Sequence, residues 1–222
     1  MEEVDKAFLL SPPGYADHYK ILSPLITAAK KHNLKKIVLM TAMGANADEN
    51  SPFRRAEVEL ENSGLNYNIV RPNWFMQNFN TFWVQPIKEQ KLILLPAGDA
   101  KTSFIDSRDI SAVVAKLLTS SEFDNRDFDI TGPQALDHNQ VASKITDSIS
   151  SEVIYEDIEP ATLRSELVNA GLPADYVDFL LLIFGFLKEG YNAGVTENVE
   201  KILGRKPHNF EQYANDYSSA WE

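Results

Sequence analysis

Short polar and proline-containing segments follow apolar stretches at several points in the first part of the chain. They comprise Ser11, Pro12 and Pro13, then Thr41, Ala42 and Met43, and then Arg71, Pro72 and Asn73. If the apolar stretches are parallel strands, these segments stand at their carboxyl ends, where ligands bind such sheets. All of them are therefore candidate ligand contacts. A purely structural interpretation stays open, because a Pro-Pro pair can simply end a strand and a threonine can cap a turn or a helix.

Aromatic residues are concentrated directly after the last of these segments. They are Trp74, Phe75, Met76 (an apolar neighbour within the run), Phe79, Phe82 and Trp83. Aromatic faces of this kind can stack on a flat aromatic substrate in an apolar pocket. Packing in the hydrophobic core explains each residue equally well, so the sequence alone leaves both interpretations open.

The composition excludes several kinds of chemistry. The 222 residues contain no cysteine, which rules out disulfides, thiolate nucleophiles and cysteine-ligated metal centres. The four histidines lie far apart and none has the spacing of metal ligands, so we expect no metal site. A net charge of −11 disfavours nucleic acid and an anionic membrane surface as partners. With no basic leader and no membrane-length apolar run, we expect a cytoplasmic protein.

Apolar strands alternate with helix-length segments up to Pro72. Strands are expected at 6–11, 35–42 and 65–72, and helices at 18–33 and 51–64. Ser51 suits a helix N-cap with Pro52 at the first helical position, and Gly64 is expected to end that helix. Strands without polar alternation, separated by helices, are typical of a parallel sheet covered on both faces. The predicted fold class is therefore α/β.

The alternation is less regular after Pro72. The expected elements are a partly helical 73–87, two short strands within 91–105, helices at 106–120 and 137–150, and strands at 126–133 and 152–159. Asp106 and Asp137 suit the N-caps of the two helices. From Pro160 onward the chain is expected to be helical. No linker or repeat interrupts it, which favours one compact unit.

Segments spread over nearly the whole chain make it similar to a known family. They are FLLSPP, KKIVLMTAMGA, AEVELENSGLNYNIVRPNWFMQNF, TSFIDSRDISAVVAKLL, FDITGPQAL, AGLP and GVTENVEKILGRKPHNFEQYANDYSSAW. In this order they resemble the NmrA-like atypical short-chain dehydrogenase/reductases, especially azoreductase-, quinone-reductase- and ergot-alkaloid-dehydrogenase-like members. The resemblance implies a Rossmann-like fold, NADP or NAD as cofactor, and hydride transfer to a small aromatic or quinone-like acceptor.

The resemblance also implies roles for particular residues. Segment 11–13 would contact the adenosine side of the cofactor and segment 41–43 would lie near the nicotinamide. Asn78 would lie near the substrate pocket, beside Trp74, Phe75, Met76 and Phe79. Glu57 matches a glutamate common in the family, although it can also be read as a surface helix residue. Arg108 and Asp109 match a family motif that we interpret as a structural ion pair or helix-start device.

Two family features are missing from the sequence. The ten glycines are too far apart to form the Gly-x-x-Gly-x-x-Gly turn that holds the pyrophosphate. The helix at 51–64 has neither the Tyr nor the Lys of ordinary short-chain dehydrogenases, so the catalytic residues are unknown. By comparison with the family, 6–11 is its fourth strand. We therefore expect an N-terminally truncated single domain with an incomplete sheet, although a natural short protein is the alternative.

These features lead to an expected organisation and function. Residues 1–72 would form the residual nucleotide-binding half, and residues 73–222 a smaller, mostly helical substrate lobe interleaved with the last sheet strands. Cofactor binding is expected to be weak without the glycine-rich turn, and the exposed first strand could self-associate. A reductase is the first expectation. A non-catalytic NAD(P)-sensing or protein-binding regulator, or an inactive fragment, are the alternatives.

Overall fold

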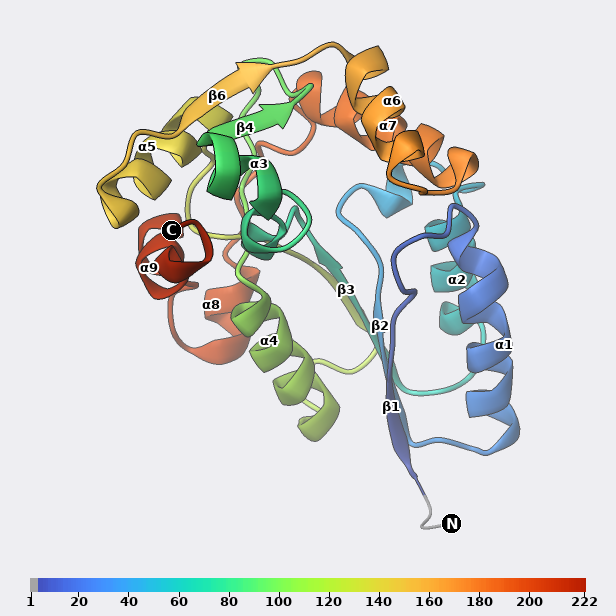
Figure 1. Cartoon of the computed structure of the whole chain (residues 1–222). Coiled ribbons are helices and arrows are strands. Elements are labelled where there is room, and N and C mark those ends of the chain that lie inside the picture. The colour runs from blue at the N-terminus through green and yellow to red at the C-terminus, as the bar shows by residue number, and fades with distance from the viewer. Residues whose placement is uncertain (1–3) are drawn as a thin grey trace.

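A parallel four-stranded sheet forms the centre of the computed structural model, which describes residues 4–222. Its order is β1-β2-β3-β5, with β1 at Lys6–Leu9, β2 at Lys36–Met40, β3 at Tyr67–Pro72 and β5 at Arg126–Ile130. The helices α1 (His18–Lys31) and α2 (Pro52–Glu61) cover one face, and α4 (Ser107–Thr119) covers part of the other (Figure 1). This arrangement confirms the predicted α/β class.

The two faces of the sheet bury alternate residues of the same strands. Ile37 and Leu39 of β2 join a core with Leu22 and Ile26 of α1. Val38, between them, joins the core on the α4 side. Side chains alternate across a strand, so a wholly apolar strand is the natural sequence for a sheet covered on both faces.

A second, smaller sheet and most of the remaining helices lie at the other end of the molecule (Figure 1). The strands β4 (Leu92–Leu95) and β6 (Ile154–Asp157) pair in parallel. Besides α4, the helical elements after β3 are η2 (Met76–Asn80), α3 (Val84–Gln90), α5 (His138–Ile149), α6 (Pro160–Asn169), α7 (Ala174–Lys188), α8 (Asn198–Leu203), α9 (Phe210–Asp216) and η3 (Ser218–Ala220). An aromatic core that includes Phe79, Phe104, Phe210 and Trp221 fills this part.

Helix starts agree closely with the sequence, whereas two other expectations were wrong. Ser51, Asp106 and Asp137 each accept a backbone N–H as N-caps. The helix expected to end at Gly64 instead ends at Glu61. The second strand expected within 91–105 is not formed, because Thr102 and Ile105 each make only an isolated bridge, to Leu136 and Phe75.

The described residues lack two kinds of feature. Among residues 4–222, no helix is both long and apolar enough to cross a membrane. Over the same range, no three His, Cys, Asp or Glu side chains gather as a metal site would require.

His138 is a buried titratable group at the start of α5. Its side chain is fully buried and packs near Phe104 and Tyr155, with ring centroids 5.6 and 5.2 Å away. Neither ring nitrogen has a hydrogen-bond partner within the described residues. Burial lowers the pKa of His138 to about 4, so the ring is neutral at pH 7.

The free energy of unfolding should therefore fall as the pH is lowered from about 6.5 to about 4, because only the unfolded chain takes up a proton on His138 in this window. The loss from this group is about 3 kcal/mol. Urea denaturation across this pH range measures it. His138→Leu should flatten the slope by about one proton's worth, whereas His32→Leu, at an exposed position, should not. If His138→Leu left the dependence of the unfolding free energy on pH unchanged, the lowered pKa of His138 would not be what destabilises the protein at acidic pH.

Candidate functional site

The predicted ligand segments lie together at the carboxyl edge of the main sheet. Hydrogen bonds continue past the strands: Thr41 N–H donates to Val70 O at 3.0 Å, and Met43 N–H donates to Pro72 O at 3.0 Å. Because Leu9 pairs with Leu39, Ser11 follows at the same edge. Pro12 and Pro13 are exposed and Ala42 and Met43 are half-buried there. The sequence-based clustering of these segments is thus reproduced, and their contacts with a cofactor remain a prediction.

Arg71 is held in a buried ion pair beneath this edge. Its Nε donates to Glu57 Oε1 and its Nη2 to Glu57 Oε2, both at 2.8 Å. Thr41 Oγ1 donates to the same Glu57 Oε1 at 2.6 Å, and Asp127 accepts from Arg71 Nη1. Burial opposes the charge, but the bonds to Glu57 and Asp127 raise the pKa of Arg71 above its usual value. The Arg71 guanidinium is therefore committed to protein partners.

This pair corrects the surface interpretation of Glu57. Its side chain is fully buried, whereas a surface helix residue would be exposed. The physical reason is Arg71, since a buried arginine needs a carboxylate in bidentate geometry. Arg54 adds a further bond to Glu57 at 3.2 Å. Through Glu57, these contacts attach the middle of α2 to the ends of β2 and β3.

Asn73 joins the sheet edge to the segment that follows α7. Its Nδ2 donates to Asn192 O at 2.8 Å and to Ser103 Oγ at 2.7 Å, and its Oδ1 accepts from Asn192 Nδ2 at 3.0 Å. Ser103 Oγ in turn donates to Gly194 O at 2.6 Å. The Asn73 amide is 3% exposed. Its hydrogen bonds hold residues 192–194 in place, where they cross the carboxyl edge of the sheet close to Met43.

Ser11 contacts His18 at the end of β1. Its Oγ lies 3.0 Å from His18 Nδ1, and the imidazole stacks on Phe53 at 3.9 Å. Phe179 of α7 lies edge-on to the same imidazole, with ring centroids 5.3 Å apart. Burial lowers the pKa of His18 to about 4, which keeps it neutral at pH 7. The β1 end of the site is therefore an uncharged contact between the sheet and α7.

The predicted substrate-binding residues separate into two groups. Met76 and Phe79 are fully buried in the aromatic core, which supports the packing interpretation for both. Trp74 is half-buried, 4.9 Å from Phe184 of α7 and 5.9 Å from Trp83 between ring centroids. Phe75 faces α4 instead, and Asn78 is half-buried within η2. Trp74, Trp83 and Phe184 thus form an aromatic cluster beside the sheet edge, and binding of a substrate there remains a prediction.

The motif residues at the start of α4 have structural partners. Arg108 binds Asp106 at 2.7 Å and Asp216 at 2.6 Å. Asp109 is fully buried, accepting from Arg205 at 2.8 Å and from the His208 N–H at 2.7 Å. The two side chains thus form ion pairs, as predicted, but with other residues and not with each other. They join α4 to the C-terminal segment.

A comparison with protein families identifies this arrangement. A family described as NAD(P)H-binding matches residues 8–121, which include the end of β1, all of β2 and β3, and the carboxyl-end segments of the three strands. The chain belongs to this family. The assignment confirms the predicted NmrA-like resemblance and the predicted cofactor class, NAD(P).

Similar proteins cover almost all of this NAD(P)H-binding chain. It is 31% identical to an NAD(P)H azoreductase of Xenophilus azovorans over 98% of the chain and 77% of that protein. It is 29% identical to prestalk A differentiation protein A of Dictyostelium discoideum, over 97% and 71%. Among solved structures, the NADPH complex of the quinone oxidoreductase QOR2 of Escherichia coli matches with a TM-score of 0.84, at 20% identity over 96% and 76%. The last match supports the Rossmann-like fold.

The described residues fit the ribose and nicotinamide of a dinucleotide better than its diphosphate. Small or uncharged residues at the ends of β1, β2 and β3 suit a ribose and a nicotinamide ring. The only arginine among the predicted contacts, Arg71, is occupied by Glu57, and the N-cap of α1 is the acidic Asp17, which repels phosphate. Among the predicted contacts in the described part of the chain, therefore, no cation or glycine-rich turn is presented to the diphosphate.

Sequence reasoning missed the residues that hold the edge together. Ser103 and Asn192 each contact Asn73 across a long stretch of chain, and His18 contacts Ser11 from seven positions further along. One signal was available for Glu57, because Arg71 stands in a strand of otherwise buried residues and requires a partner. Asn192 had no comparable signal.

Proposed function

We propose that this protein is an NAD(P)H-dependent reductase of a small aromatic or quinone-like acceptor, with weakened cofactor binding in the 222-residue chain. The observation that carries the proposal is the aromatic cluster of Trp74, Trp83 and Phe184 beside the carboxyl edge of the NAD(P)H-binding sheet. A flat acceptor could stack there. The azoreductase and quinone oxidoreductase relatives act on acceptors of this kind by their names.

The chain's own residues would serve mainly to position the reactants. NAD(P)H supplies the hydride when it is bound. The hydrogen bonds between Asn73 and Asn192 fix residues 192–194 above the sheet edge, and the Arg71–Glu57 ion pair fixes the strand ends beneath it. Hydride transfer to an electron-poor acceptor depends chiefly on holding donor and acceptor in contact. The absence of a Tyr–Lys pair from α2 is compatible with this mechanism.

A non-catalytic regulator that binds NAD(P) is the second candidate. The similarity to a differentiation protein favours it, as does the commitment of Thr41, Arg71 and Asn73 to structural contacts. An inactive fragment is the third candidate. A cytoplasmic location stays a prediction in every case.

Titration of NADPH against the purified chain tests the cofactor proposal. We expect a dissociation constant weaker than about 10 μM, since tighter binding requires roughly 7 kcal/mol from a site without a phosphate cradle. Quenching of tryptophan fluorescence measures it. A tighter constant would contradict the proposed weakening, and NADPH oxidation with a quinone or azo dye at saturating cofactor separates a reductase from a regulator.

Two matched variants test the acceptor site. Trp74→Ala should raise the KM for the acceptor about tenfold, because it removes one stacking face, and it should leave the NADPH dissociation constant unchanged. Phe82→Ala, at a 69% exposed position of the same aromatic run, should change neither. Equal effects of the two variants would argue against the Trp74 cluster as the acceptor site.

A further inference from the structure

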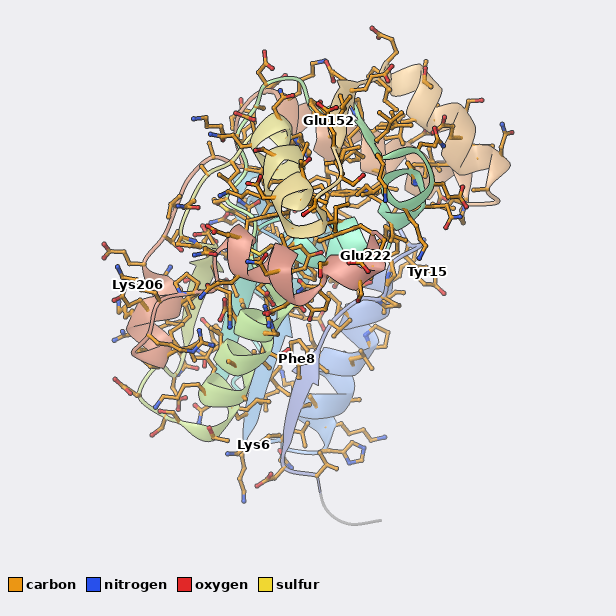
Figure 2. The ribbon with its side chains drawn as sticks, turned by 60° about the vertical axis from the view of Figure 1, so that its left-hand side comes forward. Lys6, Phe8, Tyr15, Glu152, Lys206 and Glu222 are labelled. Carbon is orange, nitrogen blue, oxygen red and sulfur yellow. The ribbon has the colours of Figure 1, made fainter. Side chains whose placement is uncertain are left out.

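α6 and α7 form a helical hairpin at the carboxyl end of the main sheet (Figure 1). In Figure 2, β1 runs from Lys6 past Phe8 toward the loop that carries Tyr15, and the hairpin lies beyond that end of the strand. Arg164 of α6 donates to Asp178 of α7 at 2.9 Å, which joins the two helices. Ligands of parallel sheets bind at this end, so the hairpin lies beside the path predicted for the cofactor.

α7 contacts both sides of the carboxyl edge. Near its start, Phe179 lies edge-on to His18, and His18 Nδ1 lies 3.0 Å from Ser11 Oγ at the end of β1. Near its end, Phe184 lies 4.9 Å from Trp74, which follows β3. Ser11 and Trp74 belong to the predicted cofactor and acceptor segments. The helix therefore spans the edge along which a dinucleotide would lie.

The base of the hairpin is firmly held. Phe184 and Leu187 are buried in the aromatic core. Lys188 Nζ donates to Asp157 Oδ2 at 3.2 Å, and Asp157 Oδ1 accepts from the Gly98 N–H at 2.9 Å. Asp157 ends β6 shortly before α6, and Lys188 ends α7. This ion pair thus joins the two ends of the hairpin to each other and to the segment after β4.

The remainder of the hairpin, residues 160–183, buries far fewer side chains. Its buried side chains are Leu163 of α6 and Val177 of α7. Most other residues of α6 are exposed. Segments with few buried apolar contacts open locally at a low cost in free energy. Residues 160–183 can therefore separate from the sheet while the base of the hairpin stays in place.

Gly185 stands where the firmly held part of α7 begins, one residue after Phe184. Glycine in a helix interior leaves the backbone freer to bend than any residue with a side chain. A Cβ at this position would meet no atom of the described residues within 4 Å, and the backbone of Gly185 is not left-handed. Neither packing nor backbone conformation requires a glycine here, which leaves flexibility as its contribution.

We propose that residues 160–183 form a lid over the carboxyl edge, which closes by the contact of Phe179 with His18 and opens by bending of α7 at Gly185 to admit NAD(P). The structure shows the closed position. The proposal rests on NAD(P) binding at this edge and is independent of whether an acceptor is reduced, so a failure of the reductase proposal would leave it intact.

Hydrogen exchange of the 222-residue chain, followed by mass spectrometry with and without millimolar NADPH, tests the lid. Without NADPH, amides of residues 160–183 should exchange at least about tenfold faster than those of β2 and β3, because the lid opens without unfolding the sheet. NADPH should slow this exchange at least about fivefold. Equal exchange of the lid and the strands would overturn the proposal, as would the absence of any slowing by NADPH in residues 160–183.

Two phenylalanine variants test the closing contact. Phe179→Ala removes the ring that meets His18 and should speed exchange in residues 160–183 about tenfold. Phe186→Ala is the matched control, because Phe186 stands on the same helix, seven positions further along, and is 47% exposed. It should leave the exchange unchanged. Equal effects of the two variants would overturn the role of Phe179.

Gly185→Ala tests the hinge, since the added methyl group fits without a clash. It should lower the rate constants for NADPH association and dissociation by about the same factor, fivefold, and leave the dissociation constant unchanged. Stopped-flow quenching of tryptophan fluorescence measures both rates. Leu182→Ala, at an exposed position of the same helix, should change neither. Unchanged rates in Gly185→Ala would overturn the hinge, as would a changed dissociation constant, which would place Gly185 in the binding site itself.

Discussion

Replacing Arg71 with methionine should lower the free energy of unfolding by about 3–5 kcal/mol, because it leaves the Glu57 carboxylate buried without its main counter-ion. Glu57 is fully buried and accepts both parallel bonds of the Arg71 guanidinium. Thr41 and Arg54 remain as donors to Glu57, but Thr41 is uncharged and Arg54 has two further carboxylate partners. Urea denaturation at neutral pH measures the loss.

The double variant Arg71→Met with Glu57→Leu is the decisive comparison. Replacing both charges with apolar groups of similar size removes the unpaired charge, so the double variant should be more stable than Arg71→Met alone. Arg164→Met is a matched control, since Arg164 forms an exposed pair with Asp178 and should change stability by less than about 1 kcal/mol. If Arg71→Met behaved like this control, the buried pair would not be what fixes the strand ends.

The main sheet was predictable because its signals are local. Apolar runs at β1, β2 and β3 separated by capped helices require only patterning within each segment. Residues 102–105 misled the same reasoning, because their apolar and β-branched residues resemble a strand. Whether such residues form a ladder depends on a partner strand, and Thr102 and Ile105 meet single residues distant in the chain.

The site was predictable only in outline, since its contacts join distant parts of the sequence. The carboxyl-end rule located segments 11–13, 41–43 and 71–73. It could not show that the Asn73 side chain hydrogen-bonds to Asn192, which lies 119 positions further along the chain. Gly132 is a similar case, because a Cβ there would lie 2.0 Å from the Phe104 carbonyl oxygen. Such close approaches depend on tertiary packing that no single segment encodes.

Truncating Trp221 to alanine should cost about 3–5 kcal/mol of the free energy of unfolding, because it removes one of the largest fully buried side chains. Its ring meets Tyr213 edge-on at 5.9 Å, and its Nε1 donates to Phe79 O at 2.8 Å. Trp221→Phe keeps most of the packing but leaves that carbonyl without its donor, so it should cost about 1–3 kcal/mol. Urea denaturation followed by circular dichroism gives both values.

Trp83→Ala is the control, because Trp83 is a partly exposed tryptophan packed on the same core, and it should cost less of the free energy of unfolding than Trp221→Ala. Since Phe79, in η2, follows Trp74 by five positions, a cost for Trp221→Ala no greater than that for Trp83→Ala would mean that the C-terminal residues do not anchor the aromatic run beside the sheet edge.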